Sequence, residues 1–186
     1  MTRTRARDIS GSYGDSDASA KPRAFPCLFG EAGWRYDASV TAQEQLDGFI
    51  DKFTPDIAAT IRRAVAMVSA RLPGATVLVY DNYNALAIGF GASEKMRSIV
   101  CSVAGYPRWV SLFLSNGPTL PDPEGLLEGE GSTVRHVKLT GDRMDSPAVA
   151  ALIDAAAASV ALPIDPVGQG RLVIKSVSAK QRPRRP

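Results

Sequence analysis

The stretch between residues 98 and 139 limits the fold most, because strand-like and strand-breaking segments alternate along it. Residues 98–104 and 109–114 are rich in β-branched and aromatic side chains, and Gly105-Tyr106-Pro107 between them is typical of a turn. Residues 120–131 contain two prolines and three glycines, so they cannot form a central strand. A third strand-like run follows at 133–139. The stretch predicts a hairpin, a surface loop and a return to the sheet.

Helix signals lie on both sides of this stretch. Thr41 and Glu44 have the spacing of a capping box, and Thr54-Pro55 and Ser146-Pro147 each place a proline at a first helical position. Apolar residues at helical spacing follow all three signals. We therefore expect two helices before residue 73 and one that ends near Leu162-Pro163.

The remaining strand signals are short and show no strand-helix-strand repeat. Residues 76–80 and 85–90 form a second predicted hairpin, and 172–177 is a possible last strand. This pattern predicts a single α+β domain with a curved, mainly antiparallel sheet, on which the N-terminal helices and a C-terminal helix pack.

Outside a predicted domain of residues 41–178, both ends of the chain are polar and basic. We expect residues 1–40 to be largely disordered, apart from an apolar arm at 25–36 that would pack on the domain or on a neighbouring subunit. In the second case the arm would form a homodimer. Residues 179–186 hold four basic and no acidic residues, and we expect a disordered tail.

Charge and cysteine content narrow the cellular setting. The net charge of +3 arises in the two ends, which favours only nonspecific, salt-sensitive contacts with nucleic acid. Cys27 and Cys101 lie far apart, which argues against a disulfide framework. No apolar run reaches the roughly 18 residues that span a bilayer. We predict a cytoplasmic protein that does not enter membranes.

Several aromatic residues fall at predicted strand ends and could line a ligand pocket. Such side chains combine an apolar body with a polar tip, although strand-end aromatics more often border a core. Two polar residues of the third strand-like run could join them, as an anion site or a general base. The candidate ligand-binding residues are Tyr80, Tyr83, Tyr106, Trp109, Arg135 and His136.

The loop before that run is acidic and could hold a hard cation such as Fe²⁺ through oxygen ligands. Its structural alternative is a helix start, with Asp122 as the N-cap and Pro123 at the first helical position. Arg135 could then pair with Asp122 or Glu124 and hold the loop on the sheet. The first helix is a second acidic surface for iron, through Glu44, Asp47, Asp51 and Asp56. The candidate metal ligands in the loop are Asp122, Glu124, Glu128 and Glu130.

The order of these segments resembles the YdhG-like family, bacterial domains that include a proposed frataxin-like iron chaperone. The resemblance covers roughly residues 44 to 160, with 109–114, 120–131, 134–139 and 152–156 as its anchors. It implies a compact α+β fold with a curved antiparallel sheet. It implies no catalytic mechanism.

Three hypotheses for function follow. We expect a non-enzymatic module that binds a ligand or a partner and needs no cofactor. The alternative is a frataxin-like iron or metal chaperone. A second alternative is a small-molecule enzyme that uses His136 and Asp122 in one closed pocket; no nucleotide-binding, nucleophile-elbow or redox motif supports it.

Overall fold

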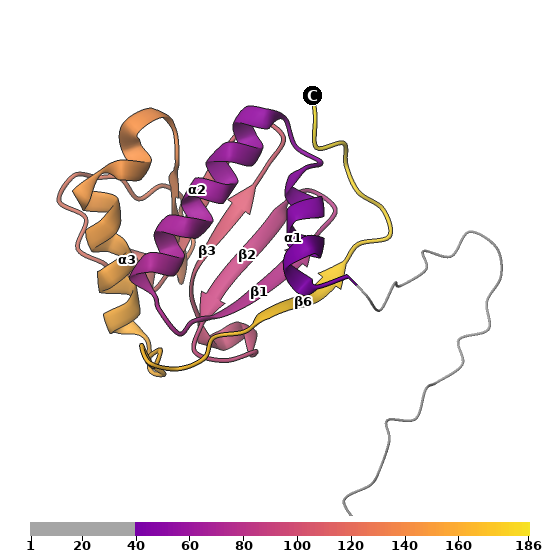
Figure 1. Cartoon of the computed structure of the whole chain (residues 1–186). Coiled ribbons are helices and arrows are strands. Elements are labelled where there is room, and N and C mark those ends of the chain that lie inside the picture. Colours follow the sequence, from indigo (N-terminus) through magenta and orange to yellow (C-terminus); the bar gives the residue numbers. More distant parts are fainter. Residues whose placement is uncertain (1–39) are drawn as a thin grey trace, which may run out of the picture. The chain divides into compact units, whose positions relative to one another are not determined.

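The computed structural model describes residues 40–186, which form a single compact α+β domain. A six-stranded sheet and three α-helices build it (Figure 1). The predicted fold class is therefore confirmed. The apolar arm at 25–36, and with it the predicted homodimer contact, lies outside the described residues.

The three helices begin at the caps that the sequence predicts. In α1 (Ala42–Ile50) the capping box is complete: the Glu44 amide donates to Thr41 Oγ1 at 3.2 Å, and the Thr41 amide donates to Glu44 Oε2 at 2.7 Å. The next helix, α2 (Pro55–Arg71), starts at the predicted proline. In α3 (Pro147–Ser159) the Ser146 hydroxyl accepts from the Ala148 amide. No helix among residues 40–186 has the length and apolar character needed to cross a membrane.

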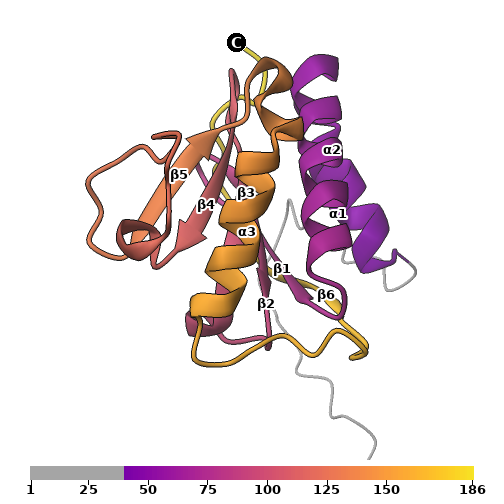
Figure 2. The same cartoon turned by 90° about the vertical axis from the view of Figure 1, so that its left-hand side faces the viewer.

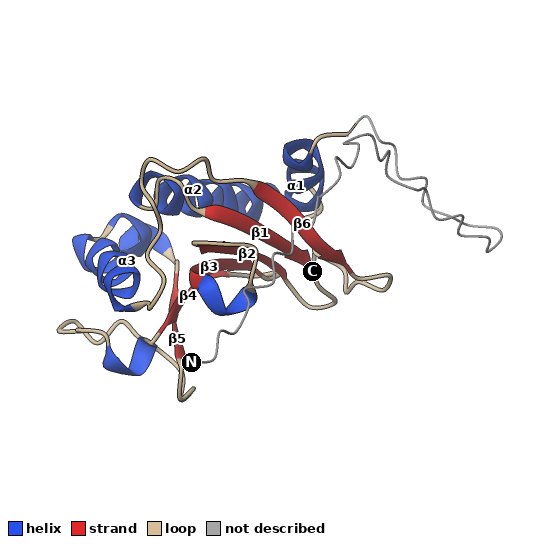
Figure 3. Ribbon diagram, turned by 90° about the horizontal axis from the view of Figure 1, so that it is seen from below, coloured by secondary structure: helices blue, strands red, loops and turns tan. Residues whose placement is uncertain are grey.

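The sheet has the strand order β5-β4-β3-β2-β1-β6, and only the β1–β6 pair is parallel. Both predicted hairpins form, and the predicted last strand pairs at one edge. Figures 2 and 3 show β4 and β5 turned away from β1 and β6, so the sheet is strongly twisted. The strands are β1 (Thr76–Asp81), β2 (Leu86–Gly91), β3 (Ile99–Gly105), β4 (Val110–Ser115), β5 (Val134–Lys138) and β6 (Leu172–Val177).

All three α-helices lie on one face of the sheet (Figure 3). Two of them, α2 and α3, pack on the central strands, and α1 packs against β6. Five aliphatic residues in register across β1 to β5 point into this layer, and each has no exposed surface: Val79, Ile88, Val103, Leu112 and Val137. The core therefore lies between this face and the helices.

The C-terminal residues differ from the expected disordered tail. The Ser178 and Arg182 amides donate to the carbonyl oxygens of Asp81 and Tyr83, which joins this segment to the β1–β2 turn. Arg184 is buried, with 4% of its surface exposed. A charge count along the sequence cannot show this contact, because its partner lies about a hundred residues earlier in the chain.

Candidate ligand-binding face

Four aromatic candidates lie near one end of the sheet. Leu86, Gly105 and Val110 are partners across three adjacent strands, so the β1–β2 and β3–β4 turns lie at the same end. In the β3–β4 turn, the rings of Tyr106 and Trp109 stack with centroids 4.9 Å apart and planes 22° apart. Trp109 is 40% exposed, which leaves part of this stacked pair open to a ligand.

A second aromatic pair lies on the β4–β5 side. Phe113 and His136 are partners across these strands, and their rings stack with centroids 5.1 Å apart. Strand alternation places Phe113 on the same face as Trp109, opposite the helices. His136 was predicted as a site residue and Phe113 was not. The alternation of Trp109, Ser111 and Phe113 was the signal in the sequence that could have indicated Phe113.

Small residues separate the two pairs. Tyr80 on β1 points to the same face as the stacked pairs. At Gly89 a larger residue would be crowded, because an added Cβ would lie 2.9 Å from Ile99 Cδ1. We call this surface the aromatic face. Its large members are Tyr80, Tyr106, Trp109, Phe113 and His136, and its small central members are Ala87, Gly89, Ser102, Ala104 and Ser111.

Two predicted ligand residues do not belong to the aromatic face. Tyr83 lies in the β1–β2 turn, is 53% exposed and forms no aromatic pair with any described residue. Arg135 is the register partner of Leu114, on the face that the helices cover. Its buried Nε has no hydrogen-bond partner within residues 40–186, and the expected ion pair with Asp122 or Glu124 does not form there.

Asp122 is used to shape the loop. Its Oδ1 accepts from the Leu126 amide at 2.9 Å and its Oδ2 from the Leu127 amide at 2.8 Å. The predicted helix start at this residue is wrong, because the chain makes a turn and Gly125 adopts a left-handed φ of 64°. Within residues 40–186 no hydrogen bond joins Asp122 to His136.

The other loop acids do not converge either. Glu128 accepts from Lys138 Nζ at 2.7 Å, and its main chain pairs with that of His136. The hydrogen bond from Lys138 and the charges of Lys138, His136 and Arg143 lower the pKa of Glu128. Glu124 and Glu130 are exposed. Among residues 40–186, no three Asp, Glu, His or Cys side chains are arranged to hold a metal ion.

The acids of the first helix mostly have local partners. Glu44 completes the capping box, Asp47 accepts from Gln43 Nε2, and Asp51 pairs with Arg62. Asp56 supplies its backbone carbonyl to Thr60 Oγ1. These contacts are those of ordinary helix and surface ion pairs.

Cys101, on β3, is a buried free thiol. It is 1% exposed, and burial raises its pKa to about 12. The thiolate is the nucleophilic form of cysteine, so Cys101 is unreactive near neutral pH.

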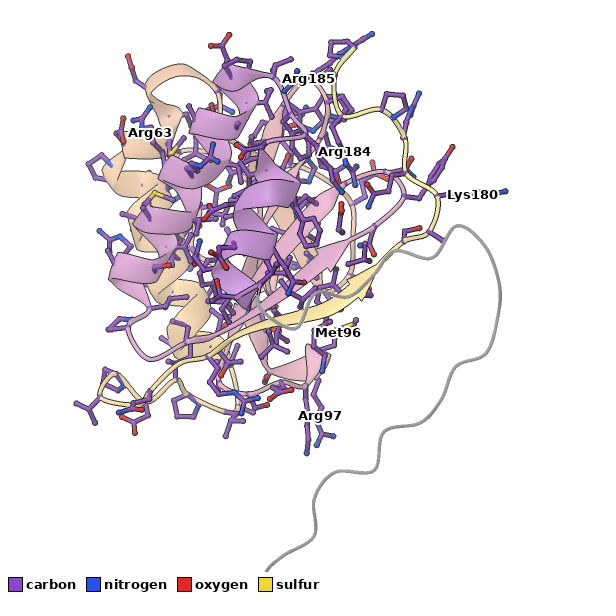
Figure 4. The ribbon with its side chains drawn as sticks, turned by 45° about the vertical axis from the view of Figure 1, so that its right-hand side comes forward. Arg63, Met96, Arg97, Lys180, Arg184 and Arg185 are labelled. Atoms are coloured by element: carbon purple, nitrogen blue, oxygen red, sulfur yellow. The ribbon has the colours of Figure 1, made fainter. Side chains whose placement is uncertain are left out.

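One buried charged cluster was not predicted from the sequence. Asp81, at the end of β1, has no exposed surface and accepts from Lys52 Nζ and Arg184 Nη2, both at 2.8 Å, and from Gln181 Nε2 at 2.5 Å. The Arg184 guanidinium also lies 5.4 Å from the centre of the Phe53 ring. Figure 4 shows Arg184 and Arg185 side by side near the top of the domain. The four polar side chains of the cluster join the C-terminal segment to β1 and to the turn that follows α1.

Comparisons of the chain with family models, curated proteins and solved structures find no match.

Proposed function

We propose that this protein is a non-enzymatic module that binds a flat apolar group, of a small ligand or of a partner, on its aromatic face. One observation carries the proposal: two stacked aromatic pairs border a centre of small residues on the sheet face opposite the three α-helices. Of the large members of this face Trp109 is exposed and the others are half-buried. Aromatic side chains that are partly open bind planar groups by stacking, and no bond has to be made or broken.

The chemistry of the other candidates favours binding over catalysis. The Cys101 thiol is buried and protonated, the His136 ring stacks on Phe113, and the Asp122 carboxylate accepts from two amides. His136 and Lys138 add polar groups at the border of the aromatic face, which suits a ligand with an apolar body and a polar edge.

The family and the compartment belong to the same proposal. We propose that the chain is a YdhG-like domain; the α+β fold with its mainly antiparallel, twisted sheet supports this. We also propose a cytoplasmic location, supported by a cysteine that is free and buried. Among residues 40–186 no specific structural observation favours the iron or metal chaperone.

The test uses phenylnaphthylamine, a neutral flat probe whose emission rises in apolar surroundings. We expect saturable binding to the full-length protein, and a loss of most of the emission in Trp109→Ala and Phe113→Ala. Tyr83→Ala is the matched control, because it removes an exposed aromatic side chain at the same end of the sheet and should leave probe binding unchanged. Probe emission that is equal in Trp109→Ala and the unmodified protein would contradict the proposal.

A further inference from the structure

A cavity of about 310 Å³ lies at the other end of the domain, beside the short 3₁₀ helix η1 (Met96–Ser98). Its volume is at the lower end of the roughly 300–1,000 Å³ typical of small-ligand sites. Figure 4 shows Met96 and Arg97 at the end of the domain far from Arg184 and Arg185. The cavity is therefore separate from the aromatic turn at Tyr106 and Trp109. It is lined by Ser93, Lys95, Arg97, Ser98, Val160, Ala161 and Leu162.

The basic side chains of this lining have no acidic partner within residues 40–186. Lys95 and Arg97 are exposed and form no ion pair within residues 40–186. The acid next to Lys95 in the sequence, Glu94, pairs instead with Arg171 and Lys175. The cavity thus has two cationic side chains whose counter-charge would come from a ligand.

The apolar part of the lining comes from the chain just after α3. Val160, Ala161 and Leu162 form it, and Leu162 is 52% exposed. Two carbonyl groups at the end of α3 already have donors, since Ser159 Oγ donates to the Ala156 oxygen and Asn116 Nδ2 donates to the Ser159 oxygen. Those carbonyl groups do not need Lys95 or Arg97 as capping partners.

The loop that carries the two cations is held in place. The buried Ser98 hydroxyl lies 2.9 Å from the Ser93 carbonyl oxygen and 2.7 Å from the Lys95 carbonyl oxygen, and it accepts from the Ser93 amide at 3.2 Å. At Gly91 an added Cβ would lie 2.4 Å from the Ser98 carbonyl oxygen, so the strand and the loop are in close contact. A fixed loop orders its charged side chains at less entropic cost when a ligand binds.

From this combination we infer a second binding site, for a small anion that carries a short apolar body, such as a medium-chain carboxylate or a phosphate monoester. The anionic group contacts Lys95 and Arg97, and the apolar body lies on Val160 and Leu162. The small volume favours a free small molecule over the acyl chains of a membrane lipid. This inference stands apart from the aromatic face and does not depend on it.

Hexanoate is the probe, followed through the amide resonances of the isotope-labelled full-length protein. We expect saturable shifts at Ser93, Lys95, Ser98 and Leu162. Acetate, which has the charge without the apolar body, and hexanol, which has the apolar body without the charge, should each bind more weakly. Because both cations are exposed, Arg97→Gln should weaken the affinity for hexanoate by about two- to fivefold. The double variant with Lys95→Gln and Arg97→Gln should weaken it by more.

Arg108→Gln is the matched control, since it removes an exposed arginine from the β3–β4 turn at the opposite end of the sheet. Hexanoate affinity in this variant should equal that of the unmodified protein. Hexanol binding as tight as hexanoate, or hexanoate affinity unchanged by Arg97→Gln, would overturn the site. If the protein sediments with anionic but not with neutral lipid vesicles, and hexanoate shifts no amide resonance, the residues contact a membrane surface and the small-anion site is wrong.

Discussion

The two faces of the sheet share the same strands and register, yet their side chains differ in kind. The row of Val79, Ile88, Val103, Leu112 and Val137 faces the helices and is fully buried. One residue along each strand, the row of Leu78, Gly89, Ser102, Phe113 and His136 faces the other way and mixes small, polar and aromatic groups. The first row is suited to packing, and we assign binding to the second.

The largest expected effect is on the helix-covered face. Leu112→Ala should lower the free energy of unfolding by about 3–5 kcal/mol, because it removes apolar contacts and leaves a cavity at a site with no exposed surface. Urea denaturation measures the loss. Phe113 is the next residue in the chain and lies on the aromatic face. Phe113→Ala should lower the free energy of unfolding clearly less than Leu112→Ala. An equal or greater loss of unfolding free energy in Phe113→Ala would contradict the assignment of packing to one face and binding to the other.

The next effect concerns the charged cluster at the end of the same packed face. Arg184→Ala should cost about 2–3 kcal/mol, less than the ~3–5 kcal/mol of a fully unpaired buried charge, because Lys52 and Gln181 still contact Asp81. Denaturation of the full-length variant measures this loss. Lys180→Ala, in the same segment but exposed, is the control and should stay within about 0.5 kcal/mol. Equal stability of the two variants would mean that the tail contributes little to folding.

On the aromatic face, Trp109→Ala should separate stability from binding. The stacked contact with Tyr106 contributes about 0.5–1.5 kcal/mol beyond the burial of the ring, so the variant should lose at least that much stability and still fold. Thermal denaturation and a far-ultraviolet circular dichroism spectrum check the fold. A Trp109→Ala protein that fails to fold would show that this side chain belongs to the core.

The smallest effect is the pH dependence of Glu128 at the border of the aromatic face. Lys138 and the nearby positive charges lower its pKa in the folded state below the ordinary value of 4.5. Its contribution is therefore present above that value and is lost as the pH falls through the lowered folded pKa. The unmodified protein should lose slightly more stability than Glu128→Gln between neutral and strongly acidic pH.

Asp142→Asn is the control for this pH effect, because Asp142 is exposed and has no salt bridge within residues 40–186. Its stability profile should follow that of the unmodified protein. Denaturation midpoints measured across the acid range compare the three proteins. Identical profiles for Glu128→Gln and the unmodified protein would show that the Glu128 carboxylate does not contribute to the pH dependence of stability.

Local signals account for the parts of the fold that the sequence predicts. The capping box at Thr41, the prolines at 55 and 147 and the alternation of β3 and β4 all act within a few residues, so they are visible in the sequence. The Asp81–Arg184 pair joins residues about a hundred positions apart, and no local pattern indicates it.

Misassigned site residues have similarly physical causes. Asp122 has the sequence of a helix cap, but Gly125 turns the chain and the carboxylate binds amides further along. Arg135 was expected to contact Asp122 or Glu124. The amides of Leu126 and Leu127 already occupy Asp122, and Glu124 is exposed. Phe113 was visible as a strand residue, and only its register with His136 makes it part of a site.

Native mass spectrometry of protein purified gently from cells, without chelator or added metal, tests directly whether the aromatic face binds a ligand or a partner. If the aromatic face binds, the unmodified protein should carry a reproducible extra mass of an organic ligand or partner. The Trp109→Ala variant should not carry this extra mass. Tyr83→Ala should retain the extra mass. An extra mass equally present on Trp109→Ala, or a bare chain that gains mass only when Fe²⁺ is added without oxygen, would contradict it.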